Sequence, residues 1–356
     1  MNIISRYLIK EISLNILLML TGLICMFSFV DFIQELDSFG NGNYGVGKMI
    51  VFVLLSAPGH IYDVAPVAVL VGAMYSLGQF SRHSELVVLR VSGISLFDIG
   101  KILIKVAIFF TIFTFLIGEL ITPFSEKLAQ RLRIQATDSV VAQDFRSGLW
   151  VKDGKSFVNV ETVLPDATLL NLHIYEFDNS FHLKTIKNAK QAKFDNNTWH
   201  LKDMSETVFE KNRVQINVYH SADWQSLLRP ELLNVLLVVP NKMSAWNLYA
   251  FIDHLQINKQ NTTRYDVALW AKLIYPLACI VMMILALPFG FLQQRSSTTT
   301  TKIFIGLFLG VVYQILNRVF AHLGTLNDWT PFISAVTPTV LFLIAGLTML
   351  FWVERR

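Results

Sequence analysis

The sequence has little charge and almost no cysteine, and each shortage excludes a class of protein. Charged residues make up 16% of the 356 residues and hydrophobic residues 53%, with a mean hydropathy of +0.48. Soluble domains are about a quarter charged, so the composition indicates an integral membrane protein. The two cysteines, Cys25 and Cys279, lie in separate apolar runs and form no CxxC motif. We therefore expect neither a disulfide framework nor a metal cluster.

The motifs of common enzyme and nucleotide-binding sites are also missing. The chain contains no G-x-x-x-x-G-K-[ST] loop, HExxH pair, G-x-S-x-G elbow or EF-hand loop. Its eight histidines are scattered without the spacing of metal ligands. We therefore expect a non-catalytic chain that binds no cofactor and no metal.

Six apolar runs are long enough to cross a bilayer, which takes about 20 residues. They cover residues 12–33, 50–78, 102–122, 267–291, 303–322 and 333–353. Basic residues gather in alternate short loops: Arg82, Arg90 and Lys101 lie between the second and third runs, and Arg295 and Lys302 between the fourth and fifth. Because basic loops stay in the cytoplasm, the pattern predicts that both termini are cytoplasmic.

Residues 123–266 then lie outside the cytoplasm, and their sequence becomes polar with strand-like alternation. "GLWVKDGKSFVNVETV" predicts two strands around a turn at Asp153-Gly154. Further hairpins are predicted around Asp178-Asn179, Asn196-Asn197 and Lys211-Asn212. After them, "SAWNLYAFIDHLQINKQ" predicts a short amphipathic helix with Ser244 as its N-cap.

The predicted fold is an α-helical membrane protein with six transmembrane helices and an inserted, extracytoplasmic, antiparallel β domain that is jelly-roll-like. Residues 1–122 hold the first three membrane helices, residues 123–266 the β domain, and residues 267–356 the last three helices.

The stretch "SRHSELVVLRVSGIS" at residues 81–95 predicts a short cytoplasmic helix over about 81–93. Ser81 is suited to cap it, Glu85 lies near the first turn, where a carboxylate suits the helix dipole, and Gly93 is placed to end it. Docking into a partner's groove would bury the apolar side chains and pair Glu85 with a basic residue. The alternative is a helix that rests on lipid.

The membrane runs contain further candidate residues. Small residues recur at Ala68, Gly72 and Ser76 and again at Gly306 and Gly310, a spacing that permits close helix approach within the chain or against a second subunit. Arg318 lies near the outer end of the fifth run, either as a functional charge at membrane depth or as a residue that snorkels to the interface. The aromatic "MFSFVDF" of the first run, which includes Phe27 and Phe32, either lines a lipid-sized cavity or faces lipid.

Several stretches together resemble the LptF/LptG family, the permease subunits of the lipopolysaccharide-export ABC transporter. "SELVVLRVSGIS" is similar to that family's cytoplasmic coupling-helix signature. "GLWVKDGKSFVNVE", "LHIYEFD" and "AKFDNNTWHL" are similar to its periplasmic domain, and more to the LptG branch than to LptF. "RYLIKE", Trp270 and Pro276 also fit. The similarity runs nearly end to end.

The resemblance implies a complex and a direction of transport. The chain would pair with an LptF-like permease and an LptB-like ATPase dimer, which uses ATP and Mg, with the helix of an LptC-like single-span protein beside the permeases. Lipopolysaccharide would leave the inner membrane through gates at the first and fifth spans. It would then pass through the β domains to LptC-like protein and an LptA-like periplasmic bridge. The alternatives are an LptF-like partner of the same complex and a membrane-anchored periplasmic scaffold.

The resemblance also implies roles for single residues. Glu85, Leu86, Leu89, Arg90 and Gly93 would form the ATPase-coupling site, in which Glu85 matches the family's glutamate, expected to meet an arginine of the ATPase. The residues expected at the lipid or at a gate are Phe27, Asp31, Phe32, Lys48, Gly306, Gly310 and Arg318.

The first span departs from the family pattern at its outer end. The family has basic residues there, whereas "DFIQELDSFG" is acidic. We hypothesise that Lys48, Arg318 or the partner subunit supplies the positive charge. The alternative is that divalent cations bridge the lipid to the carboxylates of Asp31, Glu35 and Asp37.

Overall fold

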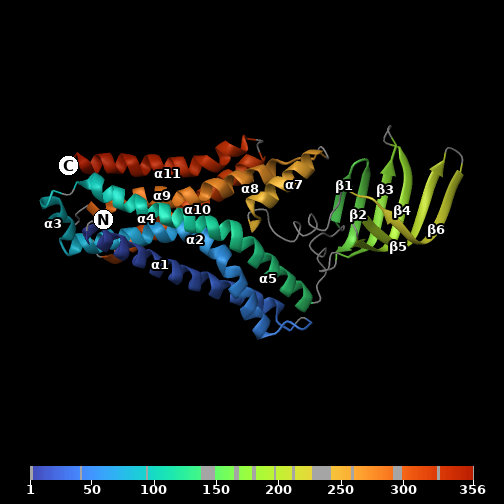
Figure 1. Cartoon of the computed structure of the whole chain (residues 1–356), viewed down its shortest axis with the longest axis horizontal. Helices are drawn as coiled ribbons and strands as arrows, with labels where there is room; N and C mark the ends of the chain where they lie inside the picture. The colour runs from blue at the N-terminus through green and yellow to red at the C-terminus, as the bar shows by residue number, and fades with distance from the viewer. Residues whose placement is uncertain are drawn as a thin grey trace.

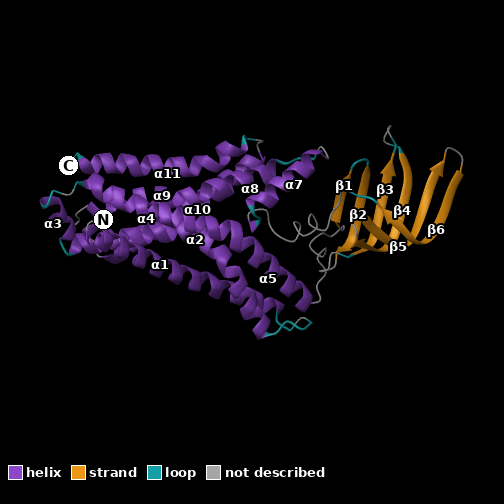
Figure 2. Cartoon of the chain, viewed as in Figure 1, coloured by secondary structure: helices purple, strands orange, loops and turns teal. Residues whose placement is uncertain are grey.

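The helices form one elongated bundle, and the strands form a separate sheet beyond one end of it (Figures 1 and 2). The computed structural model describes residues 3–40, 42–93, 95–137, 149–163, 168–178, 182–195, 198–210, 213–226, 242–257, 260–291, 299–326 and 329–355. The labelled termini and helix α3 lie at the end of the bundle away from the sheet (Figure 1). We call this the α3 end and the opposite one the sheet end.

Within the described residues, six helical stretches are long and apolar enough to cross a membrane, as the sequence predicts. The helices before the sheet are α1 (Ile3–Glu35), η1 (Leu36–Ser38), α2 (Val46–Arg82), α3 (Glu85–Val91), α4 (Leu96–Leu116), the π-helical η2 (Ile117–Ile121) and α5 (Thr122–Thr137). Those after it are α7 (Ala245–Ile257), α8 (Thr263–Ile274), η4 (Tyr275–Leu277), α9 (Ala278–Phe291), α10 (Thr299–Leu326) and α11 (Pro331–Glu354). The predicted helix after the sheet is confirmed as α7, and the Asn247 amide donates to Ser244 Oγ at 3.1 Å.

Helix α2 is the centre of the bundle and packs against α1, α5, α9 and α10. Gly72 of α2 and Gly306 and Gly310 of α10 allow this close approach. A Cβ on Gly72 would lie 2.6 Å from the Ile16 Cα of α1, and one on Gly310 would lie 2.4 Å from the Val67 side chain. Gly306 faces Met74 and Val71 of α2 in the same way. The sequence left open whether these small residues pack within the chain or against a second subunit. The contacts of Gly72, Gly306 and Gly310 are packing within the chain.

Six described strands form one antiparallel sheet in the order β1-β2-β3-β4-β5-β6. They are β1 (Leu149–Asp153), β2 (Ser156–Val163), β3 (Leu169–Phe177), β4 (Leu183–Asp195), β5 (Thr198–Glu210) and β6 (Arg213–Trp224). The antiparallel domain is thus confirmed. Each strand pairs only with its chain neighbours, so these six strands follow a meander and lack the interleaved order of a jelly roll. Short hairpins explain this, because they leave each strand beside the one before it.

The predicted hairpin at Asp153-Gly154 is confirmed by the pairing of Asp153 with Ser156 and by a φ of +59° at Gly154. Such a positive φ is one that glycine adopts without strain. The other predicted turns fall wholly or partly outside the described residues, although the strands that flank them are paired. The domain limits 123 and 266 stay a prediction, with α5 and α7 at 122–137 and 245–257 on either side of the sheet.

The single sheet shelters a core because its strands change face part of the way along. Leu169 and Leu172 of β3 are both buried, as are Leu201 and Met204 of β5, although residues three apart on a regular strand point to opposite faces. A row of polar residues crosses the sheet where the regular pairing is interrupted: Glu161, Asn171, Lys190, Asp203 and His220. Asn171 and Asp203 have φ values of 50° and 51°. We call this row the crease. The side chains that are buried on both sides of it, with Trp199 among them, form one hydrophobic cluster.

Candidate functional site at the α3 end

The short helix predicted around residue 85 exists, but it begins later than expected. Helix α2 runs to Arg82, so Ser81 belongs to its last turn and the prediction that Ser81 caps the next helix is wrong. The break falls after the buried Phe80, which prolongs the packing of α2. Ser84, at φ 62°, precedes α3, and its carbonyl oxygen accepts the Val87 and Val88 amides at 3.1 Å. The observed helix, Glu85–Val91, is therefore shorter than the predicted 81–93.

Helix α3 is anchored on one side and open on the other. Leu86 is 3% exposed and belongs to the main core of the bundle, and Leu89 packs partly buried against that core. By contrast, Val88 is 62% exposed and Val91 84% exposed. The side chain of Arg90 lies outside the described part of the chain. An exposed apolar side of this kind suits both alternatives, a partner's groove and a lipid surface.

Glu85 lies at the start of this surface, in the first turn of α3. Its side chain is 33% exposed, with Oε1 4.0 Å from His83 Nδ1, and the Tyr7 hydroxyl of α1 is close enough to hydrogen-bond to it. None of these neighbours is a lysine or arginine, so within the described side chains the carboxylate has no strong cationic partner at salt-bridge distance.

Among the described residues that follow α3, Gly93 ends this helix and Ser95 caps the next span. Gly93 has a φ of +87°, which confirms the prediction that a glycine ends this helix. Helix α4 then begins with a capping box in which Ser95 Oγ accepts the Asp98 amide at 3.2 Å and the Asp98 carboxylate accepts the Ser95 amide at 3.4 Å.

The acidic residues of the first span have partners inside the chain. Asp31 Oδ2 lies 2.5 Å from His60 Nε2 of α2, and the Phe27 ring stacks on His60 with centroids 5.5 Å apart. This arrangement joins the half of α1 nearer the sheet end to α2. Phe32 is partly buried between the clusters around Met49 and Ala129.

Glu35 is the centre of a second internal cluster at the sheet end. Its carboxylate is buried, accepts the Tyr44 hydroxyl at 2.9 Å and pairs with Arg133 of α5 at 3.3 Å. Burial and the Glu35 carboxylate raise the pKa of Tyr44. Asp31 and Glu35 thus have partners within the chain, whereas Asp37 is exposed. The hypothesis that divalent cations bridge the lipid to these three carboxylates stays a prediction.

Arg318 is exposed on α10, near enough to Asp63 of α2 for their charges to interact. One turn earlier, Gln314 donates to the Asp63 carbonyl oxygen at 2.5 Å and to the Tyr275 hydroxyl at 2.7 Å. These bonds fix the stretch of α10 from which Arg318 projects. Lys48 is half-buried in the first turn of α2. Gly306 and Gly310 are covered by α2, as described above.

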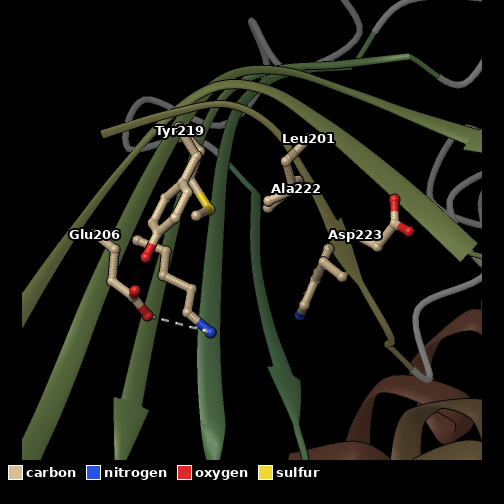
Figure 3. A pocket seen from close by; sticks show the side chains of 8 residues that line it. Leu201, Glu206, Tyr219, Ala222 and Asp223 are labelled. Carbon is tan, nitrogen blue, oxygen red and sulfur yellow. Dashed lines mark ion pairs between the residues drawn. The ribbon is translucent and has the colours of Figure 1, made fainter. Parts of the chain in front are cut away.

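Two hollows lie on the surface of the described strands. One, of about 130 Å³, lies between β4, β5 and β6. Leu201, Tyr219, Ala222 and Asp223 line it together with the Lys187–Glu206 ion pair (Figure 3). It is smaller than a small-molecule site. The other, of about 630 Å³, follows the crease, where Asn171 donates to Glu161 at 2.7 Å and Asp203 lies within 3.8 Å of both Lys190 and His220. The polar groups of the crease thus interact with one another.

The sequence analysis missed a group of four charged residues at the sheet end: Glu119, Glu126, Lys242 and Lys272. Two of them, Glu126 and Lys272, are buried. Lys272 gave the only signal available, because it is a lysine inside an apolar run. The other three lie at the borders of the predicted spans and domain, where charge is ordinary.

Comparison with known proteins places the chain in a family. The family model described as lipopolysaccharide export system permease LptF/LptG matches residues 6–352. The lipopolysaccharide export system permease protein LptG of Haemophilus influenzae is 30% identical over 357 residues, which include all of this chain and 99% of that protein. The LptG protein of Escherichia coli K12 is 30% identical over 351 residues, or 98% of each chain. The six spanning helices, the inserted antiparallel sheet and this match along nearly the whole chain agree, and the chain belongs to the LptF/LptG family of lipopolysaccharide export permeases.

Proposed function

We propose that this inner-membrane protein is an LptG-type permease subunit of an ABC transporter that extracts lipopolysaccharide from the inner membrane and passes it to a periplasmic bridge. The names of its relatives support the substrate, and the coverage of nearly the whole length of both proteins supports the same overall role. A separate ATPase subunit hydrolyses ATP, and this chain is non-catalytic.

The observation that supports this function most directly is the one-sided anchoring of α3. Leu86 fixes the helix in the core, while Val88, Val91 and the Glu85 carboxylate are left accessible. Burial of such a surface in a groove, with an arginine on Glu85, would form a charge-assisted bidentate pair. The ATPase would then push or pull α3, and the packing of Leu86 in the core would carry the motion into the bundle.

In the proposed complex, the chain pairs with an LptF-like permease, and an LptB-like ATPase dimer binds the cytoplasmic α3 end. An LptC-like single-span protein lies beside the permeases, and the sheet lies in the periplasm, where it hands the lipid to the LptC-like protein and an LptA-like bridge. The lipid meets the outer parts of α1, α2 and α10. The exposed Arg318 is the residue of this chain best suited to the lipid's phosphates.

The experiment that tests this function reverses the charge of Glu85. We expect Glu85→Lys to abolish co-purification of the ATPase dimer and the transfer of lipopolysaccharide from proteoliposomes to the periplasmic bridge protein. Asp253→Lys is the matched control, because Asp253 is an exposed acid at the sheet end. If Glu85→Lys leaves assembly and transfer at the control level, α3 is not the coupling site, and a periplasmic scaffold becomes the better function.

A further inference from the structure

The polypeptide leaves the bundle through α5, forms the sheet and returns at Lys242. The return point is held by the four charged residues that the sequence analysis missed, which we name the return clasp: Glu119, Glu126, Lys242 and Lys272. They come from η2, α5, the start of the returning chain and α8. Two are acids and two are bases, so the group is formally neutral.

Glu119 holds the first turn of α7. Its carboxylate accepts the Ala245 amide at 2.8 Å and lies 3.4 Å from the Trp246 amide, and Ser244 Oγ takes the Asn247 amide at 3.1 Å. The free amides at a helix start need such acceptors, and a carboxylate there also complements the helix dipole. Glu119 belongs to the π-helical η2, a local widening that is often found at functional positions.

Glu126 holds the residue at which the described chain resumes after the sheet. Its carboxylate, 5% exposed, lies 2.9 Å from the Lys242 ammonium. The pair sits over Gly59 of α2, where an added Cβ would lie 3.8 Å from Glu126 Oε2 and 3.9 Å from Lys242 Nζ. These are ordinary contact distances, so the ion pair packs directly against this stretch of α2.

Lys272 completes the clasp from the fourth span. It is 5% exposed, and its ammonium donates to the Met243 carbonyl oxygen and lies 5.8 Å from the centre of the Tyr62 ring. The Tyr62 hydroxyl in turn donates to the Lys272 carbonyl oxygen at 3.2 Å. Residues 242–246 are thus bound by side chains from η2, α5 and α8, next to α2.

We infer that the return clasp consists of positioning residues for lipid transfer, which keep the sheet aligned with the bundle while α3 drives the spans. This inference rests on the proposed function, since it concerns the step from the bundle to the sheet. Two domains of one chain move relative to each other by default unless a large apolar interface holds them. A buried, neutral charge network resists opening, because removal of one partner leaves an unpaired charge with little water. The chain would therefore deliver lipid to a sheet held at a fixed place.

The test compares lipid transfer, ATP hydrolysis and geometry in the complete reconstituted complex. The variants are Glu126→Gln, Lys242→Met and the charge swap Glu126→Lys with Lys242→Glu. Spin labels are placed on the exposed Val51 of α2 and the exposed Lys193 of β4, with the exposed Cys25 replaced by serine. The control is Lys187→Met, which removes an ion pair of 2.6 Å that lies wholly within the sheet.

We expect each single variant to lower lipid transfer about fivefold or more, to broaden the distribution of label distances and to leave ATP hydrolysis by the complex unchanged. The charge swap should restore part of the transfer, and Lys187→Met should leave the distances as in the natural chain. Unchanged transfer and distances in both single variants would overturn the inference, as would a narrow distance distribution that accompanies a loss of transfer. If the unaltered complex moves no lipopolysaccharide, the proposed function fails, whereas the distance measurement still decides whether the clasp fixes the sheet.

Discussion

The two ends of the bundle deal with charge and apolar surface in opposite ways. At the sheet end, Glu35 and Glu126 are buried and each is paired with a cation of the same chain. At the α3 end, Glu85 is partly exposed without a lysine or arginine at salt-bridge distance among the described side chains, and Val88 and Val91 face outward. The chain therefore pairs its own acidic groups at the sheet end, whereas at the α3 end it leaves an acid and an apolar surface that a partner can cover.

The difference indicates where the folding of the chain ends and where assembly begins. Buried ionic groups without partners cost several kcal/mol, so a sheet end that lacked its internal pairs would not be stable. An exposed apolar helix costs little while it faces water, and it gains free energy when a partner covers it. Substitutions at the two ends should therefore separate stability from association.

The largest effect on stability is expected at Glu35. Glu35→Ala leaves the buried Tyr44 hydroxyl without its acceptor and Arg133 without its carboxylate. The cost should be about 2–3 kcal/mol, mostly from the unsatisfied hydroxyl, because the half-exposed Arg133 is screened by solvent. Thermal unfolding in detergent measures it. Asp37→Ala, at a neighbouring exposed acid, should leave the midpoint temperature unchanged; an equal loss at both positions would contradict the assignment.

A smaller loss is expected from Gly93→Ala. The φ of +87° at Gly93 disfavours any side chain, although a Cβ there meets no atom within 4 Å. The strain should cost about 1 kcal/mol and shift the end of α3, so binding of the ATPase should weaken more than the stability of the bundle. Gly45→Ala is the control, because Gly45 has a φ of −101° and equally open surroundings.

The pH dependence of α7 provides a second test of the sheet end. Burial lowers the pKa of His254 below its ordinary value of 6.5, although the nearby Asp153 and Asp253 act in the other direction. The unfolded chain then binds the proton more readily than the folded one, so stability decreases as the pH falls through 6.5. The loss between pH 7.5 and 5.5 should be under about 1 kcal/mol. His254→Phe should reduce it, as measured by the exchange of the α7 amides; an undiminished loss would assign the effect elsewhere.

The periodicity of the sequence predicted the spans, the antiparallel sheet and α7, because apolar length, strand alternation and turn residues are local signals. It also located α3 and the glycine that ends it. The start of α3 was missed because Phe80 finds a core position that continues α2 past Ser81. The pairs Asp31–His60, Glu35–Arg133 and Glu126–Lys242 join residues that are 29, 98 and 116 positions apart, respectively. Only the packing of the helices brings such partners together, so no local pattern predicts them.

The smallest effect on stability, and the clearest separation of the two ends, is expected from Val88→Ser. Val88 is 62% exposed, so the loss of its methyl groups should change the unfolding free energy by no more than about 0.5 kcal/mol. In the assembled complex the same side chain would be covered, and its loss should weaken ATPase binding severalfold. Thermal unfolding of the isolated chain measures the stability, and titration with the ATPase until the chain is saturated measures the binding.

Leu86→Ser on the buried side of α3 should have the opposite effect and destabilise the isolated chain, because Leu86 belongs to the core. If both substitutions lower stability alike, α3 is part of the fold on all sides, and the contrast between the two ends of the bundle is lost.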